Sequence, residues 1–140
     1  MHKIFRQKFL LFVFALFFTP HLLADTFKWE NMKEFPPGAQ MAVISGNPDQ
    51  KGLFTVRLKL PANYIVPAHS HVVAARATVI TGTYYIGTGI VADGNIGNPL
   101  NVGDSFIIPA NNKHYGWTKE GTILQIEGTG PWHTMYSTNG

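Results

Sequence analysis

Apolar and polar residues alternate most clearly along residues 54–60. Phe54, Val56, Leu58 and Leu60 are apolar, and the residues between them are polar or charged. Because successive side chains of a strand point to opposite faces, this period of two predicts a strand with one buried and one solvated face. Shorter apolar segments predict further strands over residues 41–44, 64–66, 77–80, 83–86, 105–108 and 122–126.

Turn-forming residues separate these predicted strands. They include the stretch 45–48 and a series of glycines at positions 82, 87, 89, 94, 97, 103 and 121. Short strands divided by such turn signals are typical of an all-β sandwich or barrel. No segment after residue 24 repeats with the period of a helix over a useful length. We therefore predict a single all-β domain.

The first 24 residues have a different pattern. Lys3, Arg6 and Lys8 precede an apolar run over residues 9–18, and Ala24 ends the segment. This order predicts a secretory signal peptide, because the run is too short for a bilayer, which needs about 20 residues. An uncleaved N-terminal anchor is the alternative. We expect an exported protein, periplasmic or secreted and free of the membrane after cleavage, with a lead-in over residues 25–40 and a barrel over residues 41–135.

Removing the predicted signal peptide changes the charge of the chain. The net charge falls from +3 to about zero, because the remaining chain has eight basic and eight acidic residues. We see no basic patch of the kind that binds nucleic acid, so no nucleic-acid partner is expected. The chain has no cysteine. Disulfides and thiolate ligands are therefore excluded, and packing or a bound metal must stabilise the fold.

Two histidines form the triplet His69-Ser70-His71. On a strand, residues two apart point to the same face, so these imidazoles would lie side by side. Imidazole binds iron, zinc, manganese, nickel and copper, so the spacing predicts two ligands for a divalent metal without selecting the metal. The alternative is a solvent-facing pair at the edge of a strand.

Two segments, residues 63–82 and 103–118, resemble the two sequence motifs of the cupin superfamily. The positions that match the motif spacing are His69, His71, Gly82, Gly103, Pro109 and His114. The resemblance covers most of the chain after residue 24 and is closest to small exported bacterial cupins. It implies a single-domain jelly-roll barrel (a double-stranded β-helix) whose interior holds a divalent metal through His69, His71 and His114.

The chain departs from these motifs at three informative positions. Asn63 and Asn111 stand where the motifs have glycine. Asparagine tolerates a positive φ better than other residues with a side chain, so we expect both turns to be kept. Ala75 stands where the first motif has a glutamate, usually the fourth protein ligand in metal-binding cupins; a count from His71 places this position at Arg76 instead. A three-histidine site remains chemically sensible, as in some zinc enzymes.

Other residues are candidates for supporting roles. Gln125 and Glu127 share a face of a predicted strand, so Glu127 would replace the missing ligand or orient a histidine, unless it is a rim carboxylate in water. Arg76 would hold an anionic substrate at the pocket mouth, or it is a solvated surface residue. Three aromatic residues would line an apolar pocket or simply pack in the core: Tyr84, Phe106 and Trp117.

Three functions agree with this sequence. The first is a metal-dependent enzyme, dioxygenase-like, that acts on a small molecule. The second is a non-catalytic module that binds a small molecule or a metal, and the third is a degenerate cupin without metal. The three retained histidines favour the first two, whereas the missing glutamate favours the last two. The resemblance also implies a homodimer through edge strands, while the fold does not decide whether the protein is an enzyme.

Overall fold

The computed structural model describes residues 27–90, 92–95 and 97–136 of the chain. The signal peptide predicted over residues 1–24 lies outside the described residues. The described part consists of β-strands joined by turns, as the all-β prediction requires. Within it there is no helix of the length and apolar character needed to cross a membrane.

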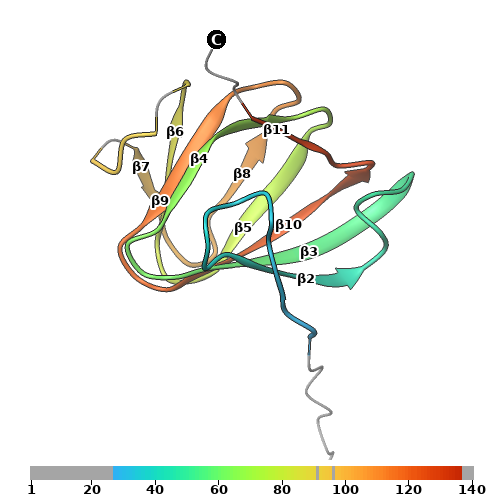
Figure 1. The fold of residues 1–140 in the computed structure, drawn as a ribbon, viewed down its shortest axis with the longest axis horizontal. Coiled ribbons are helices and arrows are strands. Elements are labelled where there is room, and N and C mark those ends of the chain that lie inside the picture. Colours follow the sequence, from blue (N-terminus) through green and yellow to red (C-terminus); the bar gives the residue numbers. More distant parts are fainter. Residues whose placement is uncertain (1–26, 91, 96, 137–140) are drawn as a thin grey trace, which may run out of the picture.

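Eleven strands form two antiparallel sheets. The strands are β1 (Glu30–Asn31), β2 (Gln40–Ser45), β3 (Gly52–Leu60), β4 (Ile65–His71), β5 (Ala75–Thr81), β6 (Tyr84–Thr88), β7 (Asn98–Leu100), β8 (Ser105–Ile108), β9 (His114–Thr118), β10 (Thr122–Gly130) and β11 (Thr134–Tyr136). One sheet has the order β1-β2-β3-β10-β5-β8 and the other β11-β4-β9-β6-β7. The two sheets face each other and curve around a shared interior (Figure 1).

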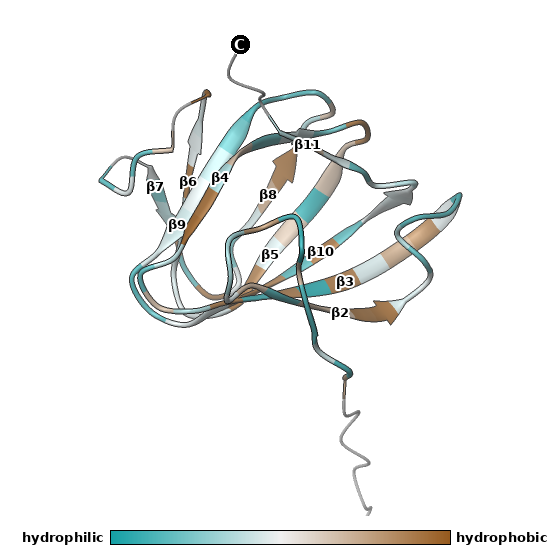
Figure 2. Cartoon of the chain, viewed as in Figure 1, coloured by the Kyte–Doolittle hydropathy of each residue, from teal (hydrophilic) through white to brown (hydrophobic). Residues whose placement is uncertain are grey.

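The core follows from the alternation along β3. Phe54, Val56, Leu58 and Leu60 are buried, whereas Lys59 between them is exposed. The hydropathy of β3 accordingly changes in bands along the strand (Figure 2). β10 lies beside β3 and β5 and adds further apolar side chains to the same interior. The predicted one-sided strand over residues 54–60 is confirmed.

Each predicted strand overlaps an observed one, but β9, like the short strands β1, β7 and β11, is not among the predictions. The face of β9 that carries His114 continues with Gly116 and Thr118, none of which is a large apolar residue, while Tyr115 on the other face is also buried. The alternation that marks β3 is therefore hidden in β9. The missed strand matters, because it carries one of the three candidate ligands.

The turns at the two asparagines adopt the predicted backbone. Asn63 has a φ of 55° and Asn111 a φ of 59°, and they are the described residues other than glycine with a positive φ. Gly82 also has a positive φ, and a Cβ added to it would lie 2.6 Å from the carbonyl oxygen of Gly121. The turns at Asn63 and Asn111 lead into β4 and β9, and the turn at Gly82 joins β5 to β6.

Candidate metal centre

Three histidines meet inside the barrel. His69 and His71 lie on β4, and His114 begins β9, where it is the direct cross-strand partner of His69. Their side chains are buried, with exposed fractions of 3%, 1% and 5%. One ring nitrogen from each lies within 4.8 Å of the other two. A solvent-facing pair, the alternative at this spacing, is therefore wrong.

Main-chain carbonyls orient two of the rings directly. Nδ1 of His69 lies 2.6 Å from the carbonyl oxygen of Pro67, and Nδ1 of His114 lies 3.0 Å from that of Asn112. A carbonyl oxygen only accepts hydrogen bonds, so each Nδ1 carries the proton and each Nε2 keeps its lone pair. Partners of this kind fix the tautomer and direction of metal-binding histidines.

The third ring is held by the C-terminal segment. Nδ1 of His71 lies 3.4 Å from the hydroxyl oxygen of Thr134, and the ring also hydrogen-bonds to the main chain of His133. These residues are at the start of β11, which pairs with β4. All three imidazoles thus have a partner at Nδ1, and the two carbonyl partners leave Nε2 of His69 and His114 available for a ligand.

The interior keeps the histidines uncharged. Burial, with the nearby His114, lowers the pKa of His69 to about 4. Burial, with both neighbouring imidazoles, lowers the pKa of His71 to about 3. The pKa of His114 is also lowered by burial. Neutral imidazole is the form that binds a metal, so near pH 7 these side chains need lose no proton to do so.

The histidines border a very small cavity of about 20 Å³. Nine other residues, all but tyrosine and tryptophan purely apolar, complete its lining: Phe35, Leu58, Val66, Tyr84, Phe106, Ile108, Leu124, Ile126 and Trp132. A void of roughly 10–15 Å³ on this scale holds one water molecule. Tyr84 and Phe106 line this space and also pack in the hydrophobic core, so the structure agrees with both alternatives for them.

The donor set fits a divalent metal. Three neutral imidazole nitrogens are a known zinc donor set, with the remaining position open to water or substrate. Nitrogens bound tetrahedrally to one ion at about 2.1 Å lie about 3.4 Å apart, so the ring nitrogens, which lie within 4.8 Å of one another, would move closer together on binding. No carboxylate of the described residues joins this group.

Small residues occupy the place of the expected carboxylate. Ala75 is buried on β5, and its neighbour Arg76 is exposed on the outer face. Ala75 is the cross-strand partner of Gly128, where an added Cβ would lie 3.1 Å from the ring of Phe54. An aromatic ring thus packs close to this position, and Arg76 is a surface residue rather than a group at the pocket mouth.

Gln125 and Glu127 do not support the histidines. The cavity is lined by their neighbours Leu124 and Ile126, so the alternate residues of β10 point outward. Gln125 donates to a carboxylate oxygen of Glu127 at 3.0 Å and accepts from Nε of Arg57 at 3.3 Å. Glu127 is exposed. The predicted replacement ligand is therefore wrong, and Glu127 is a carboxylate in water.

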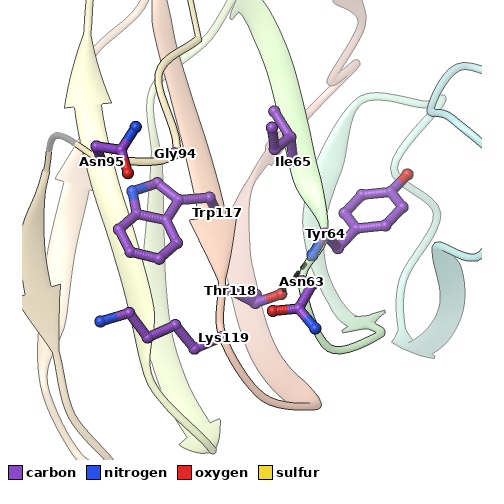
Figure 3. A pocket seen from close by; sticks show the side chains of 8 residues that line it. All are labelled: Asn63, Tyr64, Ile65, Gly94, Asn95, Trp117, Thr118 and Lys119. Carbon is purple, nitrogen blue, oxygen red and sulfur yellow. Dashed lines mark hydrogen bonds between the residues drawn. The ribbon is translucent and has the colours of Figure 1, made fainter.

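Trp117 also lies outside the histidine cavity. Its ring stacks on Tyr85, with centroids 3.9 Å apart and planes at 12°. It lines a shallow outer pocket of about 430 Å³, where Figure 3 shows the indole between Asn95 and Lys119. Trp117 stands three residues after His114, and an odd spacing on a strand reverses the face. Trp117 therefore lines a pocket on the outer face and not the cavity that the histidines border.

Two cavity residues were not predicted. Trp132 stacks on His71, with ring centroids 4.2 Å apart and planes at 22°. Phe35 meets His69 edge-on, with centroids 5.4 Å apart. Both residues lie in segments without strand alternation, beyond the two motifs, so no periodic signal marks them. They close the cavity from opposite ends of the described chain.

Solved structures give the comparison that the sequence alone does not. No protein-family model and no curated protein matches the chain. An RmlC-like cupin from Shewanella frigidimarina NCIMB 400 matches with a TM-score of 0.58 and 18% identity, over 81% of this chain and 87% of that one. The polyketide cyclase RemF from Streptomyces resistomycificus matches with a TM-score of 0.67 and 14% identity, over 81% and 82%.

A third match spans almost the whole chain. A proposed acetylacetone dioxygenase from Methylibium petroleiphilum PM1 has a TM-score of 0.64 and 16% identity, over 98% of this chain and 89% of that one. Identities this low establish shared architecture and leave the activity open. The facing sheets, the two motif turns and these matches agree, and the chain has the cupin fold.

Proposed function

We propose that this protein holds one divalent metal ion through His69, His71 and His114 and acts on a small molecule there as a metal-dependent enzyme. One observation supports this above the others. Three buried, neutral imidazoles, each with its Nδ1 already bonded, surround one enclosed point. Structural histidines in a core would not need three free nitrogens to converge.

The residues of the chain would set the properties of this centre. A bound divalent metal would supply Lewis-acid or redox chemistry. The neutral ligand set leaves its positive charge uncompensated, because Ala75 supplies no carboxylate. The apolar lining, with Phe35 over His69, excludes bulk water and strengthens electrostatic interactions inside. An electron-rich, oxygen-bearing substrate suits such a centre best.

The first reaction to examine is oxygen-dependent cleavage of a small diketone or phenol. The dioxygenase activity proposed for the Methylibium protein supports this choice. RemF, a polyketide cyclase, has the same fold. The fold therefore does not select the reaction, which depends on the substrate and on how it lies at the site. Oxygen and water are small enough for the space beside the histidines.

The size of the cavity favours a second candidate, a module that holds metal without turnover. Pockets for organic ligands usually measure about 300–1,000 Å³. The space beside the histidines is about 20 Å³. An organic substrate would therefore require Phe35 or Trp132 to move aside. A protein that only captures a metal ion would need no such movement.

Export is part of the proposal and rests on residues 1–24 alone. The basic start, the short apolar run and Ala24 support it. Fractionation of the native cells, followed by N-terminal sequencing of the product, tests it. A product that begins at Asp25 outside the cytoplasm is expected. A product that retains Met1 in the cytoplasm would contradict export and leave the metal site unaffected.

Metal content tests the site itself. The protein, purified without an affinity tag, is exposed in turn to iron, zinc, manganese, nickel and copper, and its metal is measured by mass spectrometry. We expect about one equivalent in the wild type and a large loss in His69→Ala and His114→Ala. His133→Ala is the matched control, because the side chain of His133 is exposed. Equal trace metal in all four proteins would sink the metal site.

Oxygen uptake then separates enzyme from binding module. The metal-loaded protein is supplied with a panel of small diketones, thiols and phenols. Uptake that disappears in His69→Ala supports the enzyme. A protein that binds metal stoichiometrically but consumes no oxygen and changes no substrate supports the module instead.

A further inference from the structure

The indole nitrogen of Trp132 has no hydrogen-bond acceptor. It is the one fully buried side-chain nitrogen or oxygen without a partner among the residues that the structure describes. Buried donors are almost always paired, because desolvation of an unpaired donor is costly. An exception of this kind calls for an acceptor that the chain itself does not supply.

The position of Trp132 is fixed by its surroundings. Its main-chain nitrogen donates to the carbonyl oxygen of Pro48 at 2.7 Å. Its ring packs against His71 at 4.2 Å and against Phe54 at 5.5 Å, measured between centroids. A ring held by two other rings and by its own backbone is not free to turn toward a different acceptor.

Trp132 lines two hollows, the histidine cavity inside the barrel and an outer one of about 210 Å³ beside Pro48 and Asp49, and the inner one is the candidate for holding the acceptor. Solvent does not reach the indole nitrogen. Trp132 borders the cavity of about 20 Å³ that it shares with His69, His71 and His114. Such a space holds about one water-sized ligand. The indole N–H only donates, so its partner must be an acceptor such as water or a small anion.

We propose that the indole N–H of Trp132 binds the acceptor atom of the small ligand that shares this cavity with the metal. The inference rests on the metal site proposed above and adds the chemical class of the small ligand that binds beside the metal. A ligand that both accepts a hydrogen bond and fits beside three imidazoles is water or a compact anion. Trp132 would favour such a ligand over an apolar gas of the same size.

Fluoride is a suitable probe, because a single atom fits the cavity and accepts hydrogen bonds. The full chain is loaded with cobalt(II), and fluoride binding is followed by visible absorption in the wild type and in Trp132→Phe, which keeps a ring against His71. We expect fluoride affinity to fall about tenfold in the variant, the effect of one lost hydrogen bond. Cobalt affinity should stay the same. Trp117→Phe, on the outer face, is the control with unchanged affinity.

A second measurement needs no variant in the site. In the zinc form of the wild type, labelled with ¹⁵N at tryptophan, the Trp132 indole N–H signal should move downfield when fluoride is added. The signals of Trp29 and Trp117 should stay in place. This readout keeps the inference open to test if Trp132→Phe folds poorly.

The outcomes separate this inference from the proposal beneath it. Failure of the wild type to bind cobalt or zinc would overturn the metal site and this inference together. Metal binding with equal fluoride affinity in wild type and Trp132→Phe, or with no movement of the Trp132 signal, would overturn the role of Trp132 alone. A fluoride-dependent movement with a tenfold loss would establish it.

Discussion

Two tryptophans make nearly the same contact in opposite environments. Trp132 stacks on His71 inside the barrel, and Trp117 stacks on Tyr85 on the outer surface, with centroid distances of 4.2 and 3.9 Å. The inner pair leaves a buried N–H without an acceptor. The outer pair has Lys119 beside it, 5.5 Å from the Trp117 centroid. Stacking geometry alone therefore does not distinguish a candidate functional residue, whereas a buried hydrogen-bond donor without an acceptor does.

The two environments also treat charge differently. Inside, burial lowers the pKa of His71 to about 3, so its imidazole is neutral. Outside, the ammonium of Lys119 lies 5.3 Å from the Tyr85 ring and stays in contact with water. A charge in water interacts weakly because solvent screens it, while a charge in the barrel would interact strongly. The four predictions below test this contrast, from the largest expected effect to the smallest.

The largest difference between the two stacks should appear in metal binding when the ring that packs on each tryptophan is removed. His71→Ala should abolish stoichiometric metal binding. Loss of a residue that supports a ligand lowers metal affinity about 10–100-fold, and loss of the ligand itself should lower it further. Tyr85→Ala should bind metal as the wild type does. Calorimetric titration with zinc checks both. Normal zinc binding by His71→Ala would show that the inner stack is only structural.

Truncation of each tryptophan should affect stability unequally. Trp132→Ala should destabilise the metal-free protein by about 3 kcal/mol, at the low end of the range for large core deletions, because the residue is not fully buried. Trp117→Ala should cost about 1 kcal/mol, close to the worth of an aromatic pair. Urea denaturation measures both values. Equal losses would remove the distinction between the two stacks.

Acid should weaken the inner region selectively. The pKa values of His69 and His71 in the folded state lie below 6.5, at about 4 and about 3. Below pH 6.5 the unfolded chain therefore binds protons that the folded chain does not, so the free energy of unfolding is full above pH 6.5 and falls as the pH drops toward 4. Between pH 7 and 5.5 the two together should lose about 2 kcal/mol.

Denaturation of the metal-free protein at these two pH values measures that loss. His71→Phe keeps a ring against Trp132 but cannot be protonated, so it should show a smaller dependence on pH. An equal dependence in wild type and variant would place the effect elsewhere in the chain.

The smallest effect should come from the outer charge. Lys119→Met removes an ammonium from beside two half-buried rings, a contact worth about 0.5–1 kcal/mol. The melting temperature should fall slightly, and the difference should shrink further at high salt if screening is effective. A loss as large as that of Trp132→Ala would mean that the outer stack is far less solvated than its position indicates.

The features predicted correctly from the sequence depend on the period of two. Alternation along residues 54–60 predicts β3, and the same period places His69 and His71 on one face. Two errors, the candidate roles given to Trp117 and Glu127 at the histidine cavity, come from not applying that rule. Trp117 follows His114 by an odd number of residues, and the apolar positions of β10 alternate with Gln125 and Glu127. Both sequence patterns already indicated outward side chains.

Other parts of the site depend on tertiary contacts that no local pattern encodes. Trp132 owes its place to the hydrogen bond with Pro48 and to packing on Phe54. Phe35 reaches His69 from a lead-in that has no long strand. Residues of this kind are set by chain segments far apart in sequence, so spacing within one segment carries no information about them.

The hydrogen bonds of His69 and His114 have a consequence for engineering. In each case Nδ1 bonds to the carbonyl oxygen two positions earlier in the same segment. The hydrogen bond that orients each ring therefore lies within three consecutive residues and involves no side chain from a distant part of the chain. We expect the segments Pro67–His69 and Asn112–His114 to orient an imidazole in the same way when they are placed, with the same backbone conformation, in other antiparallel barrels.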